Sequence, residues 1–262
     1  MSAVISRKAN ALFGDITVPG DKSVSHRALM LGSVAIGETH IEGLLEGEDV
    51  LATAAAMQAL GAQVSHTEAN RWTITGRGVG GLNEPDQVLN MGNSGTAVRL
   101  LMGLVGTQPF STSFTGDKSL NKRPMERVIL PLHQMGVQFT SRSGGRLPIT
   151  VYGNQLIKPI KYVLPVASAQ VKSAILFAGL NAPGKTIVIE PQPTRDHSER
   201  MLRHFGAVVI TQKLDGGSVK TTLTGQPELK GRDITVPADI SSAAFPIAAA
   251  LIIPGSKLLI RN

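Results

Sequence analysis

The sequence predicts an α/β protein, of the α+β kind, assembled from repeats of a single βαβαββ unit. The first indication is a polar helix opening that recurs four times at intervals of roughly 70–75 residues, starting at Ser23, Ser94, Ser168 and Ser241. The second is that an apolar helix, a Gly turn and a β-rich strand follow each opening. Self-similarity at a fixed period indicates an array of one supersecondary unit.

The elements within each unit follow from the spacing of apolar residues. Three- and four-residue spacing predicts helices at residues 28–34, 50–60, 96–104, 127–135, 171–180 and 198–205. Strand-like runs lie at residues 14–19, 37–41, 64–76, 110–114, 137–141, 147–151, 186–190, 208–211, 219–223, 233–236 and 255–260. A hairpin is expected at residues 214–217, where two glycines separate two strands. Each complete unit therefore reads strand–helix–strand–helix–strand–strand.

The packing of these units follows from the helix at residues 171–180, which is apolar over most of its surface. We expect three units to pack with their helices inside and their sheets outside, as one domain over residues 21–237. Residues 1–20 and 238–262 supply one strand and one helix–strand piece. We assign both ends to a second domain that is mostly missing, so the helix at residues 241–253 should expose apolar surface.

Composition limits the class of protein. The 262 residues are 42% hydrophobic and contain no cysteine, which excludes disulfides and a cysteine nucleophile and suits a cytoplasmic location. The first eight residues carry no apolar run of signal-peptide length, and no run is long enough to span a membrane. The net charge of +7 indicates an anionic partner, but 4% aromatic residues and the lack of a binding motif disfavour nucleic acid.

The candidate site residues lie at the starts of helices. Lys22 follows a Gly turn at the first start, and Ser23 and Arg27 lie one helical turn apart on one face. Backbone N–H groups at a helix start attract anions, and Arg with Lys suits a phosphate or carboxylate. The other starts carry further polar and cationic residues, and a glycine that lets a ligand approach the backbone: Asn93, Gly95, Arg123, Ser168, Gln170 and Arg195. We expect three-fold packing to bring these starts together in one electropositive pocket.

Each of these signals also has a plain structural explanation. Ser23 fits an ordinary N-cap. Asp196 and Glu199 have capping-box spacing, which favours a helix cap over catalysis for Asp196. His26 and His197 fit hydrogen-bonded structural residues, and no spacing of His, Asp and Glu indicates a metal site.

Five motifs resemble those of one enzyme family, and they occur in order along nearly the whole chain. They are Asp21-Lys22-Ser23-x-Ser25-His26-Arg27, Gly92-Asn93-Ser94-Gly95-Thr96, Lys122-Arg123-Pro124-Met125, Ser168-Ala169-Gln170 and Thr194-Arg195-Asp196-His197. In these motifs the chain is similar to EPSP synthases (3-phosphoshikimate 1-carboxyvinyltransferases). The resemblance implies two domains of three βαβαββ units each, with substrates bound in the cleft between them and no metal or cofactor.

The resemblance also implies roles for individual residues. The shikimate 3-phosphate contacts would be Lys22, Ser23, Arg27, Ser168, Ala169, Gln170 and Arg195. The phosphoenolpyruvate contacts would be Lys22, Asn93, Gly95, Arg123 and Gln170, on the side where the herbicide glyphosate binds. Lys22 and Arg123 would be catalytic, because they would stabilise the moving charge of the phosphate.

The reaction implied by the resemblance joins the 5-hydroxyl of shikimate 3-phosphate to C2 of phosphoenolpyruvate and then eliminates phosphate, a step in aromatic amino acid biosynthesis. The family's proton-transfer residues lie beyond Asn262, so we expect negligible turnover by residues 1–262 alone. The missing C-terminal portion would be a complementing partner, and we expect a monomer. Because residue 95 is Gly, we expect the intact enzyme to be sensitive to glyphosate.

Two alternatives stay open. An enolpyruvyl transferase that acts on UDP-N-acetylglucosamine has the same fold, although its usual loop cysteine is absent from this chain. The other alternative is a half-enzyme that binds anions and catalyses nothing. Comparing the binding of shikimate 3-phosphate with that of UDP-N-acetylglucosamine tests the first alternative. Adding the remaining polypeptide in trans and assaying phosphate release tests the second.

Overall fold

The computed structural model describes residue 8 and residues 10–262, so the expectations for residues 1–7 and 9 lie outside the described residues. In chain order the elements are β1 (Phe13–Thr17), α1 (Lys22–Ser33), β2 (Glu38–Glu42), α2 (Glu48–Ala59), β3 (Gln63–Glu68), β4 (Arg71–Thr75), β5 (Leu89–Asn90), α3 (Gly95–Val105), β6 (Ser111–Thr115), α4 (Glu126–Met135), β7 (Gln138–Arg142), β8 (Arg146–Tyr152), β9 (Lys161–Val163), α5 (Ala169–Gly179), β10 (Lys185–Glu190), α6 (His197–His204), β11 (Val209–Lys213), β12 (Val219–Thr224), β13 (Ile234–Thr235), α7 (Ile240–Ile252) and β14 (Lys257–Arg261). Short 3-10 turns cover Leu120–Lys122 (η1) and Asp215–Gly217 (η2). The expected mixture of helices and strands is confirmed, and the hairpin at residues 214–217 joins β11 to β12.

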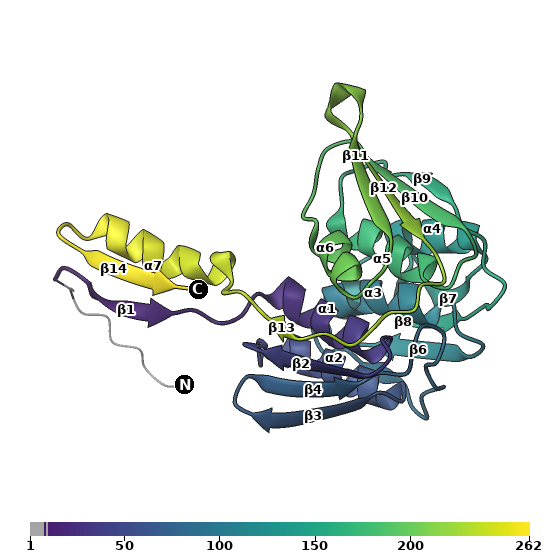
Figure 1. Cartoon of the computed structure of the whole chain (residues 1–262), viewed down its shortest axis with the longest axis horizontal. Helices are drawn as coiled ribbons and strands as arrows, with labels where there is room; N and C mark the ends of the chain where they lie inside the picture. Colours follow the sequence, from purple (N-terminus) through teal and green to yellow (C-terminus); the bar gives the residue numbers. More distant parts are fainter. Residues whose placement is uncertain (1–7, 9) are drawn as a thin grey trace.

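Three four-stranded sheets surround the helices (Figure 1). Their strand orders are β13-β2-β4-β3, β5-β6-β8-β7 and β9-β10-β12-β11. In each sheet the two hairpin strands pair antiparallel, and the first strand pairs parallel with the second. The three sheets therefore repeat one topology, as the periodic sequence predicts.

The first unit departs from this repeat in the origin of its edge strand. In the other two units the edge strand directly precedes the unit's first helix, as β5 precedes α3 and β9 precedes α5. In the first unit that preceding strand is β1, but β1 pairs with β14, and β13 pairs with β2 instead, with Ile234 opposite Ile41. The two ends of the chain have thus exchanged strands.

The two segments that connect the parts of the molecule run side by side. The Asp21 N–H donates to the carbonyl oxygen of Pro237 at 2.7 Å, and the Asp239 N–H donates to Pro19 at 2.8 Å. Beyond this double connection, α7 and the two-stranded sheet of β1 and β14 lie apart from the three sheets (Figure 1). Helix α7 exposes Phe245, Leu251 and Ile252, as the sequence predicts for a helix without partners.

The core lies among α1, α3 and α5, which the three sheets enclose. Every residue of α5 from Val171 to Gly179 is buried, and so is every residue of α1 from Val24 to Ser33. Helices α3 and α5 approach so closely that a Cβ at Gly103 would collide with the carbonyl oxygen of Ala174. This packing aligns the beginnings of the central helices, which is where the candidate site residues lie.

The structure corrects the sequence expectations at several points. Short strands β5 and β9 were not predicted, and the run at residues 64–76 is the hairpin of β3 and β4. The Asp196–Glu199 capping box is wrong: Asp196 makes no side-chain hydrogen bond to the start of α6, and Glu199 pairs with the buried Lys172 instead. Within the described residues, none of the helices has the length and apolarity needed to cross a membrane.

Candidate active site

Three side chains fix the starts of the central helices. Asp21 accepts a hydrogen bond from the Val24 N–H at 2.8 Å, Ser94 accepts from Ala97, and Ser168 accepts from Val171. Because Asp21 is the N-cap of α1, the reading of Ser23 as that cap is wrong. Ser23 is instead free of the capping role and lies at the edge of a pocket.

This pocket, of about 400 Å³, lies where α1, α5 and the segment before α6 meet. Six of the predicted site residues line it together: Ser23, Arg27, Ser168, Ala169, Gln170 and Arg195. Thr96 and His197 complete the wall. Two arginines, hydroxyl groups and an amide around one small cavity are the groups that bind a phosphate ester.

Arg27 lies at the back of the pocket and is only 3% exposed. Its Nε donates to Ser198 Oγ at 2.7 Å, its Nη2 donates to Ser173 Oγ at 2.8 Å, and its Nη1 donates to the Ser23 carbonyl oxygen at 2.9 Å. Burial lowers the pKa of Arg27 to about 10, while the Glu199 carboxylate opposes that shift, so the guanidinium stays charged at neutral pH. The three hydrogen bonds hold it in one orientation.

The Glu199 carboxylate, which acts on Arg27, belongs to a buried cluster of charged side chains. Lys172 Nζ lies 2.7 Å from Glu190 Oε2 and 2.6 Å from Glu199 Oε1, and all three side chains are at most 2% exposed. Glu190 also accepts a hydrogen bond from the Thr194 hydroxyl, one residue before Arg195. The cluster therefore joins α5, the end of β10 and the start of α6 directly behind the pocket.

Gln170 links the pocket to a second group of site residues. Its amide nitrogen donates to Thr96 Oγ1 at 2.9 Å, and its Oε1 accepts from Arg99 Nη1 at 3.1 Å. Arg99 Nη1 also donates to the Gly95 carbonyl oxygen at 3.1 Å. Burial, followed by the nearby charges of Arg123 and Arg127, lowers the pKa of Arg99 from its ordinary value.

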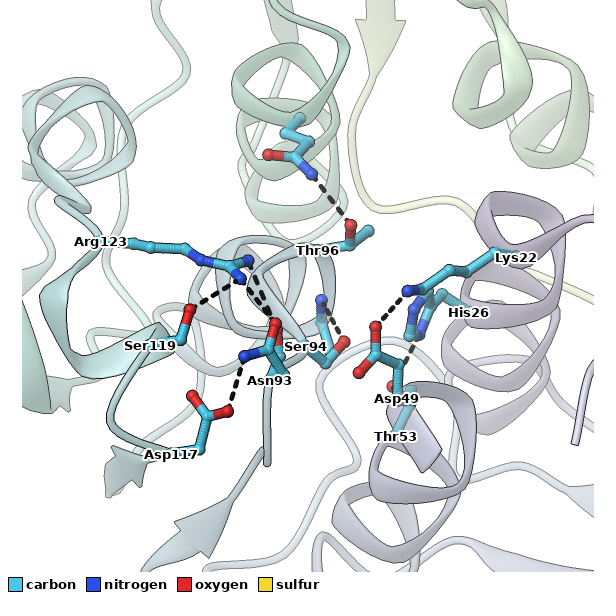
Figure 2. Close-up of polar contacts among 12 residues, drawn as sticks. Lys22, His26, Asp49, Thr53, Asn93, Ser94, Thr96, Asp117, Ser119 and Arg123 are labelled. Carbon is cyan, nitrogen blue, oxygen red and sulfur yellow. Dashed lines mark hydrogen bonds and ion pairs between the residues drawn. The ribbon is translucent and has the colours of Figure 1, made fainter. Parts of the chain in front are cut away.

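The second group centres on Arg123, on the loop that precedes α4 (Figure 2). Arg123 Nη2 donates to Asn93 Oδ1 at 2.6 Å and to Ser119 Oγ at 3.3 Å. Asn93 in turn donates from Nδ2 to Asp117 Oδ2 at 2.6 Å. Arg123 is half-buried and its partners Asn93, Asp117 and Ser119 are exposed, in contrast to the fully buried setting of Arg27.

Lys22 does not line the 400 Å³ pocket. Its ammonium group pairs with the Asp49 carboxylate, and its side chain stays about half exposed (Figure 2). It therefore reaches solvent beside the pocket, one residue away from Ser23. The structure brings the other predicted residues into two neighbouring groups, one lining the pocket and one around Arg123, with Lys22 at their margin.

Of the two histidines of this region, His26 fits the expected role of a hydrogen-bonded structural residue. His26 is fully buried, its Nδ1 lies 2.8 Å from Thr53 Oγ1, and burial lowers its pKa to about 4. His197 lines the pocket, and burial is again the main reason that its pKa lies below the ordinary value. Among the described residues, no group of three His, Cys, Asp or Glu side chains is placed to hold a metal ion.

Sequence reasoning missed the residues that hold the site in place. Arg99, Ser173 and Ser198 received no role, although each orients a predicted site residue. Arg99 follows Gly95 by four residues, so one helical turn separates them, and this spacing could have indicated the contact. Nothing in the local sequence indicates that Ser173 and Ser198 converge on Arg27, because they are 25 residues apart.

The repeated helix-in, sheet-out unit, with a cationic pocket at its helix starts, defines an α/β protein of the class that binds small anionic ligands. The chain belongs to the EPSP synthase (3-phosphoshikimate 1-carboxyvinyltransferase) family, whose model matches residues 6–262.

Individual relatives agree with this assignment. The chain is 60% identical to a 3-phosphoshikimate 1-carboxyvinyltransferase of Paramagnetospirillum magneticum over 257 residues, which are 98% of this chain and 58% of the relative. A Ruegeria relative of the same name is 59% identical, over 97% of this chain and 56% of its own length. The structure resembles an EPSP synthase from Acinetobacter baumannii with a TM-score of 0.87 and 50% identity, over 95% of this chain and 56% of that one. The chain thus spans less than three-fifths of these relatives.

Proposed function

We propose that this chain provides the shikimate 3-phosphate side of an EPSP synthase, which transfers the enolpyruvyl group of phosphoenolpyruvate to the 5-hydroxyl of shikimate 3-phosphate. The observation that carries the proposal is the convergence of Ser23, Arg27, Ser168, Gln170 and Arg195 on one pocket of about 400 Å³. Family membership supports the choice of substrate. In this proposal the protein works in the cytoplasm, in aromatic amino acid biosynthesis.

The pocket suits a sugar-like ring that carries a phosphate. Arg195 is exposed at the mouth, so its guanidinium can meet the phosphate, while the Ser168 hydroxyl and the Gln170 amide can bond ring hydroxyls. Arg27 adds positive charge from the back wall without moving, since its hydrogen bonds already fix it. A rigid wall of this kind costs little ordering on binding.

Phosphoenolpyruvate would bind at the neighbouring group formed by Asn93, Gly95 and Arg123, with Gln170 between the two substrates. Lys22 and Arg123 would stabilise the negative charge that develops on the departing phosphate. Holding both reactants in one cleft would supply the proximity that a two-substrate reaction needs. The residues that complete proton transfer would belong to the part of the enzyme outside this chain.

We further propose that residues 21–237 form one domain and that residues 1–20 with 238–262 contribute to a second. Phosphoenolpyruvate would then be held from both sides, and this chain alone would turn over negligibly. Assaying phosphate release by highly purified chain tests this point, and measurable turnover would contradict it. Adding the rest of the polypeptide in trans should restore activity, whereas an inactive mixture would favour a half-enzyme that only binds anions.

Substrate binding by the chain itself tests the central proposal. Calorimetry should detect shikimate 3-phosphate binding and much weaker binding of shikimate or UDP-N-acetylglucosamine. Arg195→Ala should weaken shikimate 3-phosphate binding by about 10-fold or more, the value of a charged hydrogen bond. The matched control is Arg142→Ala, an exposed arginine on strand β7 of an outer sheet, which should change nothing. Equal affinity for shikimate and its phosphate would overturn the proposal.

Gly95 provides a test of the phosphoenolpyruvate side. A methyl group there would lie 2.8 Å from Arg99 Nη1 and 3.2 Å from Arg123 Nη1, so both guanidinium groups would have to shift. We propose that glyphosate inhibits the completed enzyme and that Gly95→Ala weakens this inhibition by crowding the inhibitor and its cationic partners. An unchanged inhibition constant in that variant would count against this assignment.

A further inference from the structure

Two hydrogen bonds connect Arg123 to Asp117 through the Asn93 amide, and Asp117 determines which way that amide is oriented. Asp117 Oδ2 accepts from Asn93 Nδ2 at 2.6 Å, and Asn93 Oδ1 accepts from Arg123 Nη2 at 2.6 Å (Figure 2). A carboxylate only accepts hydrogen bonds and a guanidinium only donates them. The Asn93 amide between them has one group of each kind, so only one of its two flipped orientations satisfies both neighbours.

Asp117 is itself firmly placed. Its Oδ1 accepts from the Leu120 N–H at 2.7 Å, and its own backbone N–H donates to the Gly92 carbonyl oxygen at 2.8 Å. The bond from Leu120 and the bond from Asn93 hold the pKa of the Asp117 carboxyl below its ordinary value, so it remains an acceptor at neutral pH. Its carboxylate thus joins the loop before α3 to the turn that leads to Arg123.

Arg123 needs such a device because it is only half-buried. Its side-chain hydrogen bonds among the described residues are to Asn93 and Ser119: Nη2 lies 2.6 Å from Asn93 Oδ1 and 3.3 Å from Ser119 Oγ, and Nη1 lies 3.5 Å from the Asn93 carbonyl oxygen. Nε and at least one Nη1 hydrogen remain for a ligand. A long side chain that is already held by one nitrogen loses less conformational entropy when its other nitrogens bind an anion.

We propose that Asp117 is a positioning residue that orients Arg123 for its ligand through the Asn93 amide. The ligand assignment rests on the proposed function, in which Arg123 binds the phosphate or carboxylate of phosphoenolpyruvate. The orientation itself rests on the contacts alone. The two parts can therefore be tested separately.

Exchanging the two side chains gives a direct test. In Asp117→Asn the new amide keeps the Leu120 bond through its oxygen and presents NH2 to Asn93, which must flip and turn its own NH2 toward Arg123. Asn93→Asp alone places two carboxylates against each other. Combining both changes restores every bond with the same net charge. In that double variant the amide at position 117 donates to the carboxylate at position 93, which accepts from Arg123.

The first measurement needs no ligand. The ¹⁵N spectrum of the Arg123 guanidinium, assigned by its loss in Arg123→Lys, should show restricted Nη rotation in the wild type. In Asp117→Asn, faster Nη rotation should average these signals. The double variant should restore the separate signals, and Asp215→Asn in the distant β11–β12 hairpin should leave them unchanged. Unaltered Arg123 signals in Asp117→Asn, or a folded double variant that stays averaged, would overturn the proposal.

The second measurement is phosphoenolpyruvate affinity at saturating shikimate 3-phosphate. Asp117→Asn should weaken it about 3- to 10-fold, the cost of ordering one long side chain. Asp215→Asn should have no effect. If the wild-type chain binds no phosphoenolpyruvate, the ligand assignment fails, while the guanidinium spectrum still decides whether Asp117 orients Arg123.

Discussion

Arg27 and Arg123 belong to neighbouring parts of the same site, but the fold holds them by opposite means. Arg27 is 3% exposed and is bonded to hydroxyl groups from two other helices, with an ion cluster behind it. Arg123 is half-buried and is held by a hydrogen-bond chain through the exposed side chains of Asn93 and Asp117, within its own pair of loops. Desolvated charges interact strongly and are very destabilising when left unpaired, whereas solvated ones contribute little to stability. The buried side should therefore govern folding and the exposed side ligand affinity.

Removing the charge from the buried cluster should have the largest effect. Lys172→Met leaves the carboxylates of Glu190 and Glu199 facing each other without a cation, at 1–2% exposure. We expect the free energy of unfolding to fall by about 3–5 kcal/mol, measured by urea denaturation. Lys230→Met is the matched control, because its pair with Glu228 is exposed and 4.0 Å long, and it should change stability by less than about 0.5 kcal/mol. Similar losses in both variants would remove the distinction between buried and exposed charge.

Acidification should lower the stability of the fold through protonation of the buried His26. The Thr53 hydroxyl donates to the Asp49 carbonyl oxygen, so His26 donates from Nδ1, and its buried Nε2 has no hydrogen-bond partner among the described residues. The folded-state pKa is about 4, below the ordinary 6.5, so the unfolded chain takes up a proton first as the pH falls. The stability due to neutral His26 is complete above about pH 6.5 and is lost down to about pH 4, a change of about 3 kcal/mol.

The measurement is urea unfolding of the wild type and of His26→Gln across that pH range. The stability gap between them should narrow by about 3 kcal/mol between pH 6.5 and pH 4, since the variant lacks the titrating ring. His40→Gln, at a mostly exposed histidine, provides the control for general acid effects. A constant gap would show that His26 is not shielded from protons.

Lysine replacements compare the two arginines directly. Arg27→Lys keeps the charge but loses the fork that reaches Ser198, Ser173 and the Ser23 carbonyl oxygen, which should cost about 1–3 kcal/mol in unfolding free energy. Arg123→Lys should cost less than about 0.5 kcal/mol, because water replaces its partners. Thermal unfolding of both variants in one buffer makes the comparison. Equal losses of unfolding free energy in the two variants would contradict the expected difference between the two arginines.

The smallest effects should come from the two aspartates that begin helices. Asp21 accepts the Val24 N–H at 2.8 Å, so Asp21→Ala should cost about 1 kcal/mol, whereas Asp196 makes no such bond and Asp196→Ala should cost less than about 0.5 kcal/mol. Chemical denaturation of both variants checks the difference. A loss of stability in Asp196→Ala as large as that in Asp21→Ala would contradict the structure, in which the Asp196 side chain does not cap α6.

The repeat could be predicted because each unit carries the same local sequence pattern. Apolar spacing located α1 to α6, and the fourth polar opening located α7. Polar helix openings also located the residues that line the pocket, because helix starts meet when three similar units pack. The roles of those residues in binding and catalysis stay predictions. Strand β5 has only two residues, so no periodicity could reveal it.

The remaining errors come from interactions between distant segments. Glu199 has the local spacing of a cap, but it lies next to the buried Lys172, and an unpaired buried charge costs far more than an unmade cap. The register that places Ile234 opposite Ile41 likewise leaves no local mark in the sequence. Local patterns thus predict the elements, while partners that are far apart in the chain need the folded structure.

The pairing of β13 with β2 has a consequence during protein synthesis. The ribosome makes Ile41 about 190 residues before its sheet neighbour Ile234. At about 5–20 residues per second, the edge of the first-made sheet waits roughly 10–40 s for its cover. Throughout that interval an uncovered β2 is open to association with other nascent chains, so a chaperone that shields strand edges should raise the yield of this protein.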